Sequence, residues 1–347
     1  MLFRIDRTEV IQMRVRLSVS VAAFVGALIL VVGATAVHAQ NASGSKWTPK
    51  RLADGQPDIQ GMWNNEEANF TPLELPDELS GRTSFTKEEL QQLAAARRKA
   101  SIDQGDKRGD KDPGFYSLYW FDWYWKNAAA GDWPALLVEP KSGKLPALTP
   151  EARKVNAYVN EHLHDTYTNI ESGDRCISRG VLGMMLPTAY NNAKLILQPP
   201  GYVVIHSEMI HNARIIPVDG RPHLGQNIRN WEGDPRGRWE GNTLVVESTN
   251  FKPVDNMRAA GGRARQTERR RIVEKFTVVD GNTLKYSVSL DDPTTYSALW
   301  TISYPYTRDN KYQQFEYACH EGNWAVSGAL AGARAEERAR SKPSTKQ

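Results

Sequence analysis

The sequence predicts a mainly β fold, an antiparallel up-and-down barrel preceded by a helical, aromatic-rich N-terminal extension. From residue 194 onward, short apolar runs with a period of two alternate with tight-turn residues, and β-branched and aromatic side chains fill the runs. Pro-Gly, Gly-Asn and Asp-Gly pairs separate these runs, which is typical of hairpins. Eight or nine such strands favour closure, since a closed barrel leaves no exposed strand edge.

The N-terminal residues 1–39 have the pattern of a signal peptide. Arg14 and Arg16 precede an uncharged apolar run over residues 17–32, and residues 37–39 carry small side chains where a signal peptidase reads them. We therefore expect a periplasmic or secreted protein. An uncleaved membrane anchor is the alternative.

Charge and hydropathy exclude several classes of protein. Cleavage after position 39 leaves 308 of the 347 residues and removes four arginines and two acidic residues, so the net charge falls from +4 to +2. That near-neutral balance argues against a nucleic-acid partner. A mean hydropathy of −0.55 excludes a multi-span membrane protein, and we expect no integral span after cleavage. The sequence leaves the oligomeric state open.

Two helices are expected before the barrel. Thr86 and Glu89 have the spacing of a capping box at the start of a helix over residues 86–100. Thr149 is the expected N-cap of a second helix, with Pro150 at its first position, that continues to about His164. Residues 104–113 are glycine-rich and charged, and we expect a loop there.

Residues 115–125 form the densest aromatic stretch of the chain. Eight of these eleven residues are aromatic, and each ring buries about 150–250 Å² when it packs. One interpretation places the rings in the main core. The other makes them the wall of a binding cleft, with the candidate ligand-binding residues Tyr119, Trp120, Trp123 and Trp125.

The barrel is expected to span residues 171–328, after an extended and helical wrap over 40–170. The tail over 329–347 is expected to be a frayed helix or a disordered end. Its strands follow at short intervals, with turns at residues 199–201, 219–220, 241–242 and 280–282. We expect strands at residues 194–198, 202–206, 213–218, 237–240, 244–248, 271–279, 284–290, 300–304 and 313–317.

The candidate catalytic residues are His206, Glu208, His211 and Arg214. His206 and Glu208 are two residues apart on an expected strand, so they share a face. A histidine could act as a base that the carboxylate orients. The spacing also resembles the metal-binding strand pair of cupins, although the His and Glu positions differ, so a metal stays open and no cofactor is required. Outward-facing polar residues without a site are the third interpretation.

A second polar group lies over residues 223–240. Its candidate ligand-binding residues are His223, Arg236, Arg238, Trp239 and Glu240. Arg238 and Glu240 share one strand face and Trp239 takes the other. An arginine here could hold an anionic group in bidentate fashion. The alternative is a tryptophan that closes the barrel under a capping arginine, similar to lipocalins.

The chain contains two cysteines, Cys176 and Cys319, at the two ends of the expected barrel. In an exported protein such a pair can form a disulfide. A bridge that closes so long a loop stabilises the fold by about 4–5 kcal/mol in the chain-entropy model. We expect a structural disulfide and not a catalytic thiol.

Several strings resemble a family of exported bacterial proteins of uncharacterised function, found in environmental proteobacteria and acidobacteria. They are Asp-Gly-Gln-Pro-Asp-Ile-Gln-Gly-Met-Trp at 54–63, Leu-Val-Glu-Pro-Lys-Ser-Gly-Lys-Leu-Pro at 137–146, Asp-Gly-Arg-Pro-His at 219–223 and Gly-Arg-Trp-Glu-Gly-Asn-Thr-Leu-Val-Val at 237–246. The resemblance spans most of the mature chain. It implies export and one shared architecture, and it implies no activity. A shorter likeness links the Gly-x-Trp element to lipocalin-like barrels.

Two functions fit these observations. The first is an exported protein that binds an apolar or aromatic small molecule in a pocket of the β-barrel, since ligand pockets are mostly apolar with a few placed polar groups. The second is a periplasmic hydrolase or lyase that uses the His/Glu/Arg cluster, with or without a metal. No Walker loop, dinucleotide fingerprint, nucleophile elbow or His-Glu-x-x-His motif occurs.

Overall fold

The strands of this protein form a single antiparallel sheet. The computed structural model describes residues 47–108, 117–252 and 267–341, so the expected signal peptide at 1–39 lies outside the described residues. The chain from Pro49 to Gln347 forms one unit. The strands are β1 (Gly61–Asn64), β2 (Leu137–Glu139), β3 (Lys194–Leu197), β4 (Tyr202–Ser207), β5 (Asn212–Pro217), β6 (Asp234–Glu240), β7 (Thr243–Thr249), β8 (Arg271–Val278), β9 (Thr283–Asp291) and β10 (Trp300–Arg308).

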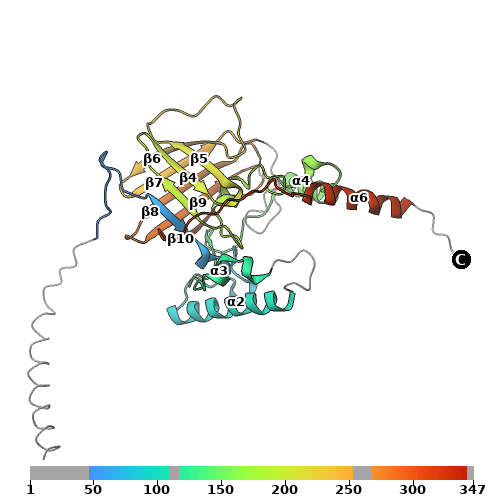
Figure 1. Cartoon of the computed structure of the whole chain (residues 1–347), viewed down its shortest axis with the longest axis horizontal. Helices are drawn as coiled ribbons and strands as arrows, with labels where there is room; N and C mark the ends of the chain where they lie inside the picture. Colours follow the sequence, from blue (N-terminus) through green and yellow to red (C-terminus); the bar gives the residue numbers. More distant parts are fainter. Residues whose placement is uncertain (1–46, 109–116, 253–266, 342–347) are drawn as a thin grey trace, which may run out of the picture. The chain divides into compact units, whose positions relative to one another are not determined.

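The sheet curls into a nearly closed barrel, which confirms the predicted fold class (Figure 1). The strand order is β5-β4-β3-β1-β10-β9-β8-β7-β6, with β2 paired to β10 beside this path. Its two end strands, β5 and β6, meet at Gly237. A Cβ there would lie 2.7 Å from Val218 Cγ1 and 3.0 Å from Ile216 Cγ2. Glycine therefore allows the two edges to come together where the hydrogen-bonded ladder stops.

Strand β1 departs from a simple meander. It comes from the expected N-terminal wrap, yet it pairs with β3 on one side and β10 on the other. Trp63 of β1 is completely buried, and its indole Nε1 donates to Ile59 O at 2.8 Å. Burial of so large a ring explains why this short segment completes the sheet.

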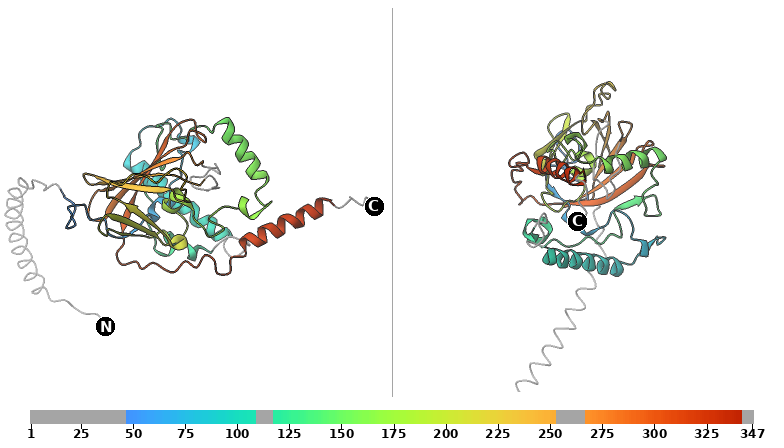
Figure 2. Two further views of the ribbon diagram at one scale, coloured as in Figure 1. Left: turned by 90° about the horizontal axis from the view of Figure 1, so that it is seen from above. Right: turned by 90° about the vertical axis from the view of Figure 1, so that its right-hand side faces the viewer.

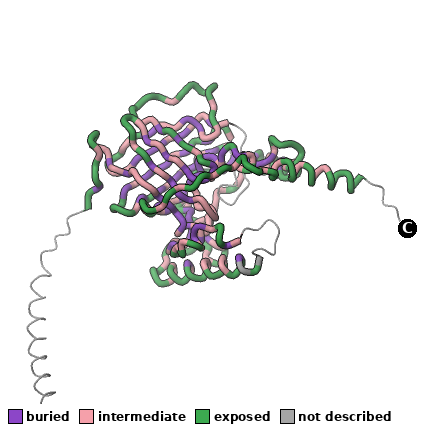
Figure 3. Tube along the Cα trace, in the orientation of Figure 1, coloured by how far each residue is buried: buried purple, intermediate pink, exposed green. Residues whose placement is uncertain are grey.

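The barrel interior is the main hydrophobic core. Buried residues alternate with less buried ones along the strands, as the period of two requires (Figure 3). Tyr286, Tyr304 and Tyr306 point inward, and the hydroxyls of the last two donate to Met185 O. Met185 belongs to a short helix, α5 (Gly180–Met185), that packs into this core. Figure 2 shows the sheet from two further directions.

The helices begin where the capping residues predict. The backbone N–H of Glu89 donates to Thr86 Oγ1, and that of Thr86 donates to Glu89 Oε2. Thr149 Oγ1 accepts from the backbone N–H of Ala152 at 3.0 Å. The α-helices are α2 (Lys87–Arg108), α3 (Asp122–Trp125), α4 (Pro150–Glu161), α5 and α6 (Ala325–Ser341), and short 3-10 helices include η1 (Glu66–Phe70), η4 (Leu118–Trp120) and η6 (Met209–His211).

Two local predictions are wrong. Residues 313–317 form no strand, because the Phe315 N–H donates to the Glu208 carboxylate and the Gln314 side chain donates to His206 O in place of a backbone ladder. Residues 104–108 continue helix α2 and are not loop. For the tail, α6 agrees with the helical alternative. Within the described ranges, no helix is both long enough and apolar enough to cross a membrane.

Candidate functional site

The aromatic segment divides its rings between a small core and the protein surface. Trp123 is buried and packs edge-on against Phe70 of η1, with ring centroids 4.9 Å apart. Leu118 joins the same small core. The rings of Tyr119 and Trp120 stay 76% and 65% exposed. Two short helical turns, η4 and α3, separate the inward side chains from the outward ones.

These exposed rings line a cleft of about 1030 Å³, called the aromatic cleft here. The cleft lies outside the barrel, between η4 and α3, residues 173–176, the loop at 190–191 and the segment after β10. Its aromatic lining consists of Tyr119, Trp120, Trp125, Tyr190, Tyr312, Phe315 and Tyr317. Thus Tyr119, Trp120 and Trp125, three of the four candidate ligand-binding residues of this segment, line one cavity. Trp123 packs in the small core next to them.

Residues 309–324, called the C-terminal segment, make one wall of the cleft. Gln314 attaches this segment to β4, because its Nε2 donates to Ala193 O and His206 O, at 3.2 Å each. The same side chain presents Oε1 to His206 Nδ1 at 2.7 Å. Since Oε1 only accepts, His206 carries its proton on Nδ1. His206 therefore helps to position the wall of the cleft.

Glu208 and His211 hold the same segment. Glu208 is buried, and its carboxylate accepts from Tyr312 Oη at 2.9 and 3.0 Å and from the Phe315 backbone N–H at 2.8 Å. His211 is exposed and places Nδ1 2.8 Å from Tyr317 O. Three of the four candidate catalytic residues, His206, Glu208 and His211, thus bind the C-terminal segment.

Arg214 lies on the other side of the sheet wall. In the antiparallel register it faces Ile205, which points into the barrel, whereas His206 is directed outward. Its guanidinium pairs with the buried Glu274 carboxylate at 3.0 and 2.5 Å. Despite the cost of burial, this pairing holds the pKa of Arg214 above its ordinary value. Tyr286 Oη also donates to Glu274, at 3.0 Å.

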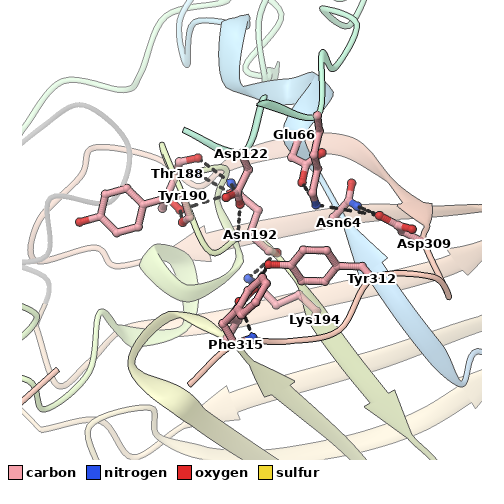
Figure 4. Close-up of polar contacts among 12 residues, drawn as sticks. Asn64, Glu66, Asp122, Thr188, Tyr190, Asn192, Lys194, Asp309, Tyr312 and Phe315 are labelled. Carbon is pink, nitrogen blue, oxygen red and sulfur yellow. Dashed lines mark hydrogen bonds and ion pairs between the residues drawn. The ribbon is translucent and has the colours of Figure 1, made fainter. Parts of the chain in front are cut away.

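A polar cluster beside the aromatic cleft contains Asp122, Asn192, Lys194 and Tyr312 (Figure 4). Glu208 belongs to it through its contacts with Tyr312 Oη. Asp122 Oδ2 accepts from the backbone N–H and the Nδ2 of Asn192, at 3.0 and 3.2 Å. Lys194 Nζ donates to Asn192 O at 2.9 Å. Asp122 and Tyr312 both line the cleft, so the cluster connects the cavity with the buried lysine.

Lys194 is the most unusual titratable group of this cluster. Its side chain is only 2% exposed, and burial lowers the pKa of the ammonium to about 7 against the opposing charges of Glu208 and Asp122. No carboxylate oxygen of the described chain lies within 4 Å of its Nζ. Burial and Glu208 also raise the pKa of Tyr312 above its ordinary value. Strong shifts next to a cavity are typical of functional sites.

A smaller cavity of about 460 Å³ shares Trp125 and Tyr312 with the aromatic cleft. In it, Lys126 Nζ binds Glu66 and lies 3.9 Å from Asp309 Oδ2. The same ammonium lies 3.9 Å from the ring centroid of Tyr312 and 5.2 Å from that of Trp125. Burial raises the pKa of Glu66 to about 6, although Lys126 opposes the shift.

The second predicted group, at residues 223–240, lies apart from the lining of the aromatic cleft. His223 Nδ1 and Arg236 both contact the buried Asp234, at 3.0 and 2.6 Å. Arg238 pairs with Glu240 at 2.8 Å on the exposed face. Trp239 is partly buried and packs against the barrel core.

Cys176 and Cys319 form a disulfide, with Cα atoms 5.6 Å apart. Both residues also line the aromatic cleft. The bond therefore ties the C-terminal segment to the opposite wall of the cavity, at residues 173–176.

Sequence reasoning missed Asp122, Lys194, Tyr312 and Phe315. A signal did exist for Lys194, because it shares its strand parity with the inward-facing Ile196. Nothing local marks the other three, which approach the lysine only through the tertiary fold. Within residues 47–108, 117–252 and 267–341, no group of three or more His, Cys, Asp or Glu side chains could hold a metal ion.

Comparisons with protein-family models, with curated proteins and with solved structures find no match for this chain.

Proposed function

We propose that this protein is exported and binds an apolar or aromatic small molecule in the aromatic cleft. The main support for this proposal is the cleft itself, which has a volume of about 1030 Å³ and is lined by seven aromatic residues. It is unfavourable to leave so many aromatic rings exposed to water. A bound ligand would bury their apolar surface, and exposed apolar patches often mark ligand-binding sites. Tyr119, Trp120 and Phe315 remain 76%, 65% and 66% exposed.

The proposed site lies outside the barrel and not within it. The inward side chains of the strands pack against one another and against α5 as one core. The cleft instead has a wall of rings above polar groups that could orient a ligand. The barrel in this proposal is the rigid support, and the segments attached to its outer face form the site.

Export is part of the same proposal. It rests on the basic and apolar pattern of residues 1–39 and on the Cys176–Cys319 disulfide, which persists in an oxidising compartment. A periplasmic or secreted location follows. Fractionation of the expressing cells tests it, and recovery of the full-length, unprocessed chain in the cytoplasm would contradict it.

The binding experiment uses N-phenyl-1-naphthylamine, a neutral fluorescent aromatic probe. We expect saturable binding that Trp120→Ala weakens by about tenfold, as loss of one aromatic contact does. The matched control is Tyr158→Ala, which removes an equally exposed ring from α4, away from the cleft lining. No saturable binding, or equal weakening by both substitutions, would refute the proposal.

A second candidate function is an enzyme that transfers protons at the base of the cleft. The favouring observation is the Tyr312 hydroxyl, which lines the cleft and donates to both oxygens of the buried Glu208. Hydrolysis of nitrophenyl esters tests this hydrolase activity. Tyr312→Phe should abolish turnover while it retains binding of the neutral probe. Absence of turnover in the wild type, or equal turnover in the variant, excludes this candidate for these substrates. Elemental analysis of the purified protein tests the metal-dependent form.

A further inference from the structure

The charges that line the aromatic cleft all have one sign. Asp122, Asp174, Glu316 and Glu321 are carboxylates, and no lysine, arginine or histidine occurs among the described residues of the lining. Asp174, Glu316 and Glu321 are exposed, and none of them forms an ion pair with another residue of the described part of the chain. Their negative charge is therefore not neutralised by a direct ion pair within the described part of the chain.

The fourth carboxylate is built into the base of the cleft. Asp122 is buried, and two N–H groups of Asn192 hold its Oδ2 in place. Its own backbone N–H donates to Ala189 O, which fixes the main chain of this residue as well. A fixed carboxylate next to a cavity attracts a cation more strongly than one in bulk water, because the surrounding protein screens less.

The two lysines behind the lining, Lys126 and Lys194, each have acidic neighbours. Lys126 is neutralised by Glu66 and lies within 3.9 Å of Asp309. Lys194 is faced by Glu208 and Asp122, the two acidic groups that interact with it. Neither lysine lines the cleft, so the field within the cavity follows the four carboxylates.

The aromatic walls already accept a cation in this structure. The ammonium of Lys126 lies 3.9 Å from the ring centroid of Tyr312 and 5.2 Å from that of Trp125. Both rings also line the aromatic cleft. An ammonium group is attracted to the face of such a ring within about 6 Å. Ring faces and carboxylates together make the chemistry that recognises organic ammonium ions.

We propose that the aromatic cleft selects organic cations, that is, amines or quaternary ammonium compounds with an aromatic or alkyl body. This inference rests on the proposed binding function and adds the class of ligand. The body of the ligand contacts Tyr119, Trp120 and Phe315, and its positive group faces the carboxylates of the lining. Anions of the same size are repelled.

The test compares three probes that share one naphthyl body and differ in charge. They are 2-(1-naphthyl)ethylammonium, 2-(1-naphthyl)ethanol and 1-naphthylacetate, titrated by calorimetry at pH 7.5 and low salt. We expect the cation to bind about tenfold more tightly than the alcohol, and the anion to bind most weakly. Raising NaCl to 0.5 M should reduce the preference for the cation.

Variants separate charge from shape. The double substitution Asp174→Asn and Glu316→Gln removes two of the four carboxylates, so it should reduce the cation's advantage over the alcohol and leave the affinity of the alcohol unchanged. The control is Glu240→Gln, which removes an exposed carboxylate of β6 outside the cleft lining and should preserve the preference.

The outcomes distinguish this inference from the proposed function. If the alcohol and the cation bind equally well, the charge selection is overturned while the binding function stands. If no probe binds, both are overturned. If the double variant keeps the full preference and melts at the wild-type temperature, the carboxylates named here are not the cause.

Discussion

Lys194 makes the stability of the fold depend on pH, and this dependence can be measured directly. Its ammonium is only 2% exposed, and burial lowers its pKa to about 7 from an ordinary value of 10.5. Between these two values the unfolded chain binds more protons than the folded one. The free energy of unfolding must therefore rise with pH across this window.

The magnitude follows from the two pKa values. A shift of one unit corresponds to about 1.4 kcal/mol, so a group with these values adds about 2 kcal/mol to the free energy of unfolding between pH 7 and pH 9. Below pH 7 the contribution becomes constant, since both states are then protonated. Lys194→Met keeps the length of the side chain and removes the titration.

The assay is urea unfolding at pH 7, 8 and 9, followed by tryptophan fluorescence. We expect the wild type to gain about 2 kcal/mol relative to Lys194→Met over this range, whatever the other groups contribute. Lys285→Met, which removes an exposed lysine of β9, serves as the control and should keep the wild-type slope. Parallel pH profiles for the wild type and Lys194→Met would refute a buried, strongly shifted lysine.

Three further predictions concern the stability of the fold. Replacing both disulfide cysteines by serine should lower the free energy of unfolding by about 4–5 kcal/mol, measured in urea, and should weaken probe binding because one cleft wall is released; unchanged binding would show that the bond does not position the cleft. Glu274→Ala should cost about 3–5 kcal/mol, because it leaves the guanidinium of Arg214 buried and unpaired; a loss below about 1 kcal/mol would mean that water reaches this pair. Gly237→Ala should cost about 1–3 kcal/mol, since its Cβ would contact the opposite strand edge at 2.7 Å; Gly281→Ala, with nothing within 4 Å, is the control, and an equal effect of the two would contradict the closure at Gly237.

Local patterns explain why the strands and helix starts could be predicted. Turn residues and a period of two depend only on neighbours in the chain, so the hairpins from β3 to β9 follow from the sequence. The capping pairs at Thr86 and Thr149 are equally local. Strand β1 was not predicted, because its place between β3 and β10 depends on pairing across more than 100 residues.

The candidate site shows the same division between local and long-range information. The dense rings of residues 115–125 allowed two interpretations, core packing or a cleft wall. Trp123 packs in a small core, and Tyr119, Trp120 and Trp125 line a cleft. The register of β4 and β5 turns His206 outward and Arg214 inward, so the sheet separates these two candidate residues. Register is set by the whole sheet, and a shift of one residue reverses every side chain.

The sequence by itself determined the class of fold, the turns, the helix caps and the aromatic density, because each depends on side-chain chemistry within a few residues. Only the tertiary structure decided where the chemistry gathers. It brought the C-terminal segment back across β4, placed Tyr312 over Glu208 and buried Lys194 beside the cleft. Lys194 and Tyr312 are 118 positions apart in the sequence, and only the packing of the folded chain brings them together.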